Sequence, residues 1–177
     1  HIITPTKTIP LDRLKVRDGL NPKSRQLNEV FKKFTADQIR EANEDNEKFS
    51  KIESWFNSQK NKIKEDTKTL CFIDFIENRF PKEEEIEFMT DLAYCNSNIT
   101  TIPFTSEMVI KQDNYDEFEN YIKKAIETIQ QLNNKPIMGI IPHKMAPKKV
   151  EDLIDLYDSQ GINSFAIDLD GKNPITA

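Results

Sequence analysis

Residues 136–170 decide the fold, and they read PIMGIIPHKMAPKKVEDLIDLYDSQGINSFAIDLD. An apolar run at each end predicts a strand, over residues 136–141 and over residues 164–169. Between them Pro147 predicts the start of a helix and Gly161 its end. Proline fits the first helical turn, and glycine readily adopts the left-handed conformation that often follows the last turn. A strand, a helix and a strand in this order are typical of a parallel β-α-β unit.

The same alternation extends towards the middle of the chain. Further strands are expected over residues 69–75 and 99–104, and amphipathic helices are expected from Pro81 and from Tyr115. The strands are apolar almost throughout, which predicts burial on both faces and hence a parallel sheet covered by helices. We therefore expect an α/β unit over residues 69–177, either part of a (β/α)8 (TIM) barrel or an open doubly wound sheet.

Two features favour the partial barrel. No glycine-rich turn of the dinucleotide-binding or P-loop kind follows a strand. The chain also stops soon after a strand, and it opens with His1 rather than methionine, so we expect a piece of a larger protein. Because a complete barrel needs about 250 residues, this chain would supply only part of one. The likeness to barrel enzymes covers only a widely shared fold and includes no functional motif.

The first part of the chain, residues 1–68, is expected to be mostly helical, with one short strand near its start. Residues 1–70 carry 15 basic and 11 acidic residues, whereas residues 71–177 carry 10 and 19. A basic excess suits an acidic partner or nucleic acid. Because Lys and Glu are interspersed rather than clustered, this charge favours a solvated helical surface over binding to nucleic acid.

One helix is expected after Pro22, with Leu27, Val30, Phe31 and Phe34 at helical spacing on its apolar face.

A second helix is expected from Ala36 to about Lys64, after a capping box formed by Thr35 and Gln38. Its apolar stripe is narrow and consists of Ala42, Phe49, Phe56 and Ile63, with Ile52 and Trp55 beside them. Such a stripe is typical of a helix packed on its own domain or of one that contacts another subunit. Both interpretations stay open, and the second makes Phe49, Trp55 and Phe56 the candidate partner-binding residues.

Ionisable residues lie where three of the four strands end. The carboxyl ends of parallel strands meet at one edge, where α/β enzymes place their active sites. Asp74, His143 and Asp168 are therefore the candidate catalytic residues. The candidate substrate-binding residues at the same edge are Thr105, Lys144 and Asp170.

His143 suggests two kinds of chemistry. Oriented by a carboxylate, it is suited to general acid–base catalysis, and together with Asp74, Asp168 or Asp170 it would also suit a metal. The structural alternative is a histidine that caps the following helix or bonds a backbone carbonyl. The spacing forms no local motif, so no metal site is assigned and the cofactor is unknown.

Three lysines surround the start of the helix that Pro147 opens. Lys144, Lys148 and Lys149, together with free backbone amides, are suited to binding phosphate. Pro147 itself lacks an N–H group and therefore weakens this interpretation.

The composition also bears on the cellular compartment of the protein. Two cysteines, Cys71 and Cys95, cannot form a disulfide framework, and neither a secretory signal nor an apolar run of membrane-spanning length is visible. We expect a cytoplasmic protein that does not enter a membrane.

Two functions remain open, and with them the question of whether the chain is an enzyme. The first is a catalytic α/β domain acting on a small polar or phosphorylated substrate, with a nucleoside- or base-modifying enzyme as one form. The alternative is a non-catalytic accessory or assembly domain whose long helix binds another subunit.

Overall fold

The structure, a computed structural model, describes residues 2–5, 27–61, 68–106, 109–132 and 135–168. Its strands are β1 (Ile2–Pro5), β2 (Leu27–Phe34), β3 (Lys68–Phe75), β4 (Ile99–Thr101), β5 (Phe104–Thr105), β6 (Ile137–Pro142) and β7 (Ser164–Asp168). Its helices are α1 (Ala36–Glu44), α2 (Asn46–Lys60), α3 (Glu83–Asn96), α4 (Tyr115–Leu132) and α5 (Pro147–Ser159), with a short 3-10 turn, η1 (Gln112–Asn114).

The strands form one parallel sheet in the order β1-β7-β6-β4-β3-β2, and β5 continues beside β3 where β4 ends. The expected parallel α/β unit after residue 69 is therefore confirmed. The sheet also includes β1 and β2, so it joins both sides of the change in composition near residue 70. As described, the sheet is open, with β1 and β2 at its edges.

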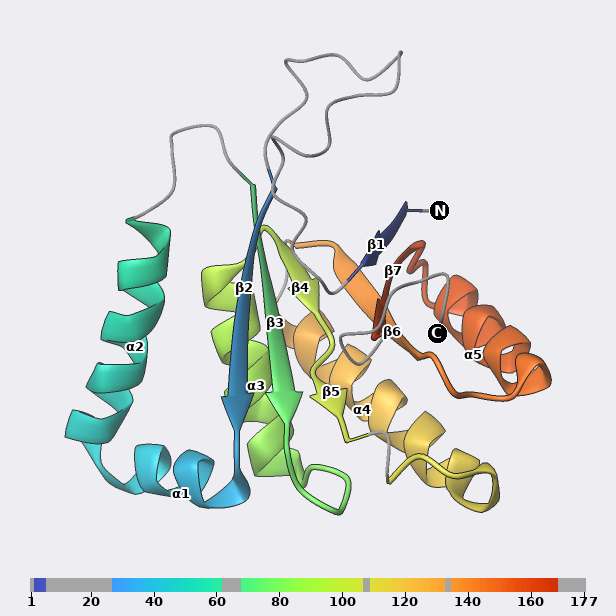
Figure 1. Cartoon of the computed structure of the whole chain (residues 1–177), viewed down its shortest axis with the longest axis horizontal. Coiled ribbons are helices and arrows are strands. Elements are labelled where there is room, and N and C mark those ends of the chain that lie inside the picture. The colour runs from blue at the N-terminus through green and yellow to red at the C-terminus, as the bar shows by residue number, and fades with distance from the viewer. Residues whose placement is uncertain (1, 6–26, 62–67, 107–108, 133–134, 169–177) are drawn as a thin grey trace, which may run out of the picture.

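The helices pack on one face of this sheet. From β2 to β7 the chain adds each strand on the same side of the previous one, and right-handed crossovers that never reverse place their helices on one face. Phe88 of α3 packs edge-on against Phe34, with ring centroids 5.5 Å apart, and Tyr157 of α5 lies 5.5 Å from Phe165. In Figure 1, α2 lies at the left, α5 at the right, and α3 and α4 between them behind the strands.

The sheet is split on one side of β6. Strand β4 pairs with β6 only at Thr100–Ile137 and Thr101–Met138, after which the chain turns to pair with β3 as β5. Pro103, between β4 and β5, has no N–H group to continue the ladder. The expected strand over residues 99–104 is thus two short strands, and the edge of β6 beyond Met138 has no neighbouring strand on this side.

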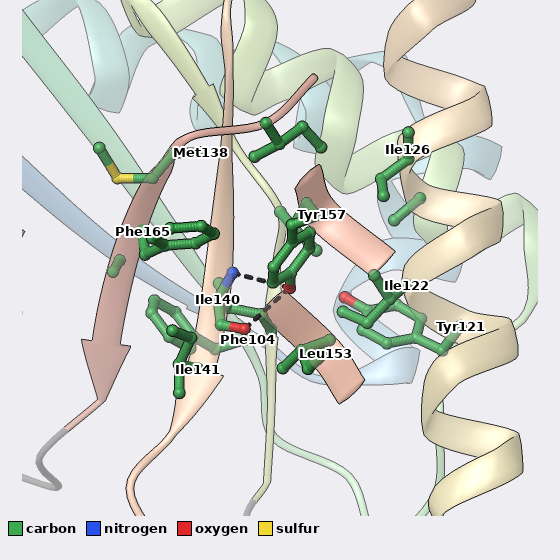
Figure 2. Packing of buried hydrophobic residues seen from close by; sticks show 14 of the residues in the cluster. Phe104, Tyr121, Ile122, Ile126, Met138, Ile140, Ile141, Leu153, Tyr157 and Phe165 are labelled. Atoms are coloured by element: carbon green, nitrogen blue, oxygen red, sulfur yellow. Dashed lines mark hydrogen bonds between the residues drawn. The ribbon is translucent and has the colours of Figure 1, made fainter. Parts of the chain in front are cut away.

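Tyr157 fills the split. The carbonyl groups of Met138 in β6 and of Pro136 directly before it accept bonds from the β4 side, so the polar groups of Ile140 face the same way. The Tyr157 hydroxyl donates to the Ile140 carbonyl at 2.8 Å and accepts from the Ile140 N–H at 3.0 Å, as Figure 2 shows. Its ring lies against Gly139, where an added Cβ would come within 2.7 Å of a ring carbon. One side chain thus replaces a strand at this position.

The expected helix after Pro22 is wrong over residues 27–34, which form strand β2. Val30 and Phe34 are four residues apart, a spacing that puts them on one face of a helix and equally on one face of a strand. Eight consecutive residues of β2 pair with β3, and this non-local pairing determines the conformation. Pro22 itself lies outside the described residues.

The expected long helix is interrupted at Asp45. The capping box at its start is confirmed, because the Gln38 amide donates to Thr35 Oγ1 at 3.1 Å and the Thr35 amide donates to Gln38 Oε1 at 3.0 Å. Asp45 is extended, and its carboxylate accepts the Glu47 amide at 2.8 Å, which starts α2 afresh. Aspartate favours caps over helix interiors because its side chain competes for backbone amides.

Other local expectations are confirmed. Gly161 has a φ of 72° just after α5, as expected for a left-handed residue beyond a helix end.

Among the described helices, none is long and apolar enough to cross a membrane.

Candidate functional site

The carboxyl edge of the sheet brings the sequence-predicted residues together in two pairs. Asp74 pairs in register with Phe104, which precedes Thr105. Pro142, which precedes His143, pairs in register with Asp168. The split between β5 and β6 lies between the two pairs. Asp170 lies outside the described residues.

Asp74 is within electrostatic reach of a buried tyrosine, Tyr121. The Tyr121 hydroxyl, from α4, donates to the carbonyl of Pro103. Burial raises the pKa of Tyr121 well above its ordinary value, and the charge of Asp74 adds to this effect. Asp74 is half-buried. Thr105, which follows Phe104, the register partner of Asp74, is buried. The Asp74 carboxylate is therefore within electrostatic reach of a neutral phenol, at the end of β3 that faces the carboxyl edge.

A cationic cavity lies beside His143. It has a volume of about 160 Å³ and is lined by Ile110, Lys111, Tyr115, Lys144, Met145, Ala146 and Lys149. We call it the lysine cavity. Three lysines line it in a chain whose net charge is -5, and none of its lining residues is acidic. This arrangement favours an anionic ligand.

Contacts between α4 and α5 build the wall of the lysine cavity. The Tyr115 hydroxyl donates to the Lys149 carbonyl at 3.3 Å, and the Lys149 ammonium lies 4.3 Å from the centroid of the Tyr115 ring. Burial, followed by the charges of Glu119, Asp152 and Asp116, raises the pKa of Tyr115 to about 12. Tyr115 is therefore a neutral hydrogen-bonding group at physiological pH.

The segment before α4 positions Lys111. The Lys111 amide donates to Asn114 Oδ1 at 2.7 Å, and the Asn114 side-chain amide donates to the carbonyl of Val109. These bonds fold residues 109–114 into the turn that carries Lys111 to the cavity. Sequence reasoning missed Lys111, because nothing local marks it and only the fold places it beside Lys144.

The start of α5 contributes less than the sequence suggested. Ala146 provides no side-chain cap, and the Lys149 and Val150 amides both donate to the Ala146 carbonyl, at 2.8 and 3.0 Å. Lys148 is not part of the cavity and lies 3.5 Å from Glu151 and 3.4 Å from Asp152. The cationic character of the cavity therefore comes from lysine side chains more than from helix amides.

The candidate partner-binding residues differ in their surroundings. Phe56 is only 1% exposed and lies 5.0 Å from Trp55, ring centroid to centroid. Trp55 is half-buried, and the Lys32 ammonium lies over its ring, 4.5 Å from the ring centroid. Phe49 is half-buried, 6.2 Å from Phe88, and lines a large groove between α2 and α3. Of the three, Phe49 is the one that lines this groove.

Glu29 is a further chemistry-bearing residue that the sequence did not suggest. Its Oε2 atom is buried and has no hydrogen-bond partner among the described residues, and burial raises the pKa of the carboxyl group from 4.5 to about 7. It lies on β2 opposite Leu70, towards the amino end of the strand. Glu29 is therefore separate from the carboxyl edge.

No group of metal-binding side chains is found in the described part of the chain. Within it, no three His, Cys, Asp or Glu side chains are grouped so that they could hold a metal ion. Both cysteines are free: Cys95 is exposed, and burial raises the pKa of the Cys71 thiol to about 12. Cys71 is thus kept in the unreactive thiol form.

Comparisons of this chain with protein-family models, with curated proteins and with solved structures each find no match.

Proposed function

We propose that this chain is a catalytic α/β domain that binds a small phosphorylated substrate at the carboxyl edge of its sheet. The lysine cavity carries the proposal. Lysine ammonium groups bind phosphate as point charges, and three of them line a cavity of about 160 Å³ that contains no acidic side chain. The location agrees with the general rule that parallel α/β sheets bind ligands beyond the carboxyl ends of their strands.

The catalytic groups proposed are Asp74, His143 and Asp168. Lys144 lines the cavity and directly follows His143, and β6 pairs with β7 where Asp168 lies. A phosphate held in the cavity would direct the rest of a substrate along this edge. His143 is the side chain suited to moving a proton near neutral pH, and the two carboxylates are suited to orienting it or acting as bases. Thr105 and Asp170 are proposed substrate ligands.

A binding experiment with pyrophosphate tests the proposed cavity. Backbone amide resonances recorded by NMR during a titration should shift at Lys111, Tyr115 and Lys149. The variant Lys111→Met/Lys149→Met removes two cations and keeps their apolar stems, so the affinity should fall about tenfold or more. Lys148→Met is the matched control, because Lys148 lies on the same helix turn outside the cavity.

Equal weakening by Lys148→Met and by the double variant would show that pyrophosphate only senses the surface charge. Resonance shifts confined to another region would likewise refute the cavity as the phosphate site. The catalytic assignment is tested afterwards, with the phosphorylated compounds that bind: Asp74→Asn and His143→Gln should retain binding and lose turnover.

The compartment proposed is the cytoplasm, supported by the two free cysteines.

A further inference from the structure

A groove of about 730 Å³ between α2 and α3 lies away from the carboxyl-edge site. Its apolar walls come from Phe49, Phe88, Leu92 and Leu132. Its charged lining residues are Glu53, Glu84, Glu87, Asp91 and Lys60. We call it the acidic groove.

The carboxylates of the acidic groove differ from others on the same helix. Glu83 pairs with Lys124 at 2.9 Å, and Glu85 pairs with Arg79 at 2.8 Å. Within the described residues, neither Glu53 nor the three acids that α3 presents to the groove form an ion pair. Among the described residues, Glu83 and Glu85 beside the groove thus form ion pairs, whereas the acids that line it form none.

Two acids that line the groove, Glu87 and Asp91, repel each other. Glu87 and Asp91 lie four residues apart on α3, so their like charges face each other on one side of the helix. Burial and the charge of Glu87 both raise the pKa of Asp91. The lysine in the lining, Lys60, donates to the carbonyl of Cys95 at 3.3 Å. A cation brought into the groove would relieve the Glu87–Asp91 repulsion.

We propose that the acidic groove is a docking site for a basic amphipathic helix of a partner protein. An apolar groove between two helices fits the apolar face of a third helix, the packing found when helical peptides bind in grooves. Lysine or arginine residues flanking that face would meet Glu53 on one wall and Glu84, Glu87 and Asp91 on the other. The excess of negative charge excludes nucleic acid and acidic peptides from the same surface.

Cys95 provides a local reporter for this interaction. It lines the groove and is exposed, whereas Cys71 is buried. A peptide seated in the groove should therefore slow the alkylation of Cys95, which binding elsewhere would leave unchanged. The probe is a 14-residue peptide of leucine and lysine at helical spacing, matched to the length of α3. Two control peptides are a scrambled sequence of the same composition and a leucine–glutamate version.

Charge-reversal variants distinguish binding in the groove from general attraction between the basic peptide and the acidic protein. The variant Glu87→Lys/Asp91→Lys changes the net charge from -5 to -1, because each substitution adds two charges. Asp155→Lys/Asp158→Lys on α5 makes the same change outside the groove. The groove variant should weaken peptide binding about tenfold or more and abolish protection of Cys95, and the α5 variant should change either by less than about twofold.

Three outcomes would overturn the proposal. Equal weakening by both variants would reduce the interaction to net charge. Binding that leaves Cys95 fully reactive would place the peptide elsewhere. Equal binding of the scrambled peptide would remove the requirement for a helix. Circular dichroism of each variant confirms that the fold is retained, and none of these results depends on the phosphate site.

Discussion

The two halves of the sheet are held together in different ways. Strands β2 and β3 pair over eight consecutive residues, whereas β4 and β6 pair over two, and beyond them the Tyr157 hydroxyl takes over the bonds of Ile140. A backbone ladder distributes its stability over many bonds. A side chain that replaces a strand concentrates it in one residue. The half built around β6 should therefore be far more sensitive to single substitutions.

The largest effect is expected for Tyr157→Phe. The ring still fills its place, but the buried N–H and carbonyl of Ile140 both lose their partner. Each unsatisfied group costs about 1–3 kcal/mol, so we expect the free energy of unfolding to fall by about 2–4 kcal/mol. Chemical denaturation measures this loss.

Hydrogen exchange sharpens the result for Tyr157→Phe. The Ile140 amide should lose protection while amides of the β2–β3 ladder keep theirs. Uniform loss of protection across both halves would contradict the proposed division of the sheet.

Gly139→Ala should have the next largest effect. The new Cβ would lie 2.7–2.9 Å from three carbons of the Tyr157 ring, which is fixed by its two hydrogen bonds. Overpacking of this kind costs about 1–3 kcal/mol, and thermal unfolding of the variant measures it. If Gly139→Ala is as stable as the parent, the ring is not fixed, and the hydroxyl bonds cannot carry the role assigned to them.

Thr100→Val should stabilise the protein modestly. Thr100 lies in β4, next to the split, and its buried Oγ1 atom has no hydrogen-bond partner in the described structure. Valine has nearly the same shape without the polar atom, so we expect a gain of about 1 kcal/mol. Thr128→Val is the control: its hydroxyl donates to the Lys124 carbonyl at 2.8 Å, and no such gain is expected there. Equal gains in both variants would show that the missing partner is irrelevant.

The last effect concerns Glu29, in the half with the long ladder, and it depends on pH. Because its pKa is raised to about 7 in the folded state, the folded protein binds more protons than the unfolded chain between about pH 4.5 and 7. The contribution of Glu29 to stability is therefore lost as the pH rises through this window. In Glu29→Gln the decline should be smaller, as measured by denaturation at a series of pH values. An unchanged decline would assign it to other groups.

Local patterns predicted much of the fold. Apolar runs located β3, β6 and β7, and the residues at helix ends, such as Thr35 and Gly161, were correct because capping depends on neighbours in sequence. The strand β2 was not predictable in this way, since the spacing of Val30 and Phe34 fits both a helix and a strand. Its conformation follows from pairing with β3, which begins more than thirty positions later.

The candidate site was predictable only in outline. Parallel strands bring Asp74, Thr105, His143 and Asp168 to one edge whatever the details, and this placement rests on topology alone. Lys111 could not be predicted to join Lys144 and Lys149, because the lysine cavity forms only when α4 and α5 pack together. Tyr157 likewise looked like one more apolar residue of its helix, since the need for its hydroxyl arises from a gap between two strands.

The pairing of β1 with β7 has a consequence for biosynthesis. Ile2–Pro5 is the earliest described strand to leave the ribosome, and its partner Ser164–Asp168 is the last. Strands β2 and β3 can pair while synthesis continues, but β1 must wait for β7 to emerge. Contacts between such distant segments form slowly because a large loop has to close first. Strand β1 should therefore be the last of the described strands to dock, and until then the outer edge of β7 stays exposed to other nascent chains.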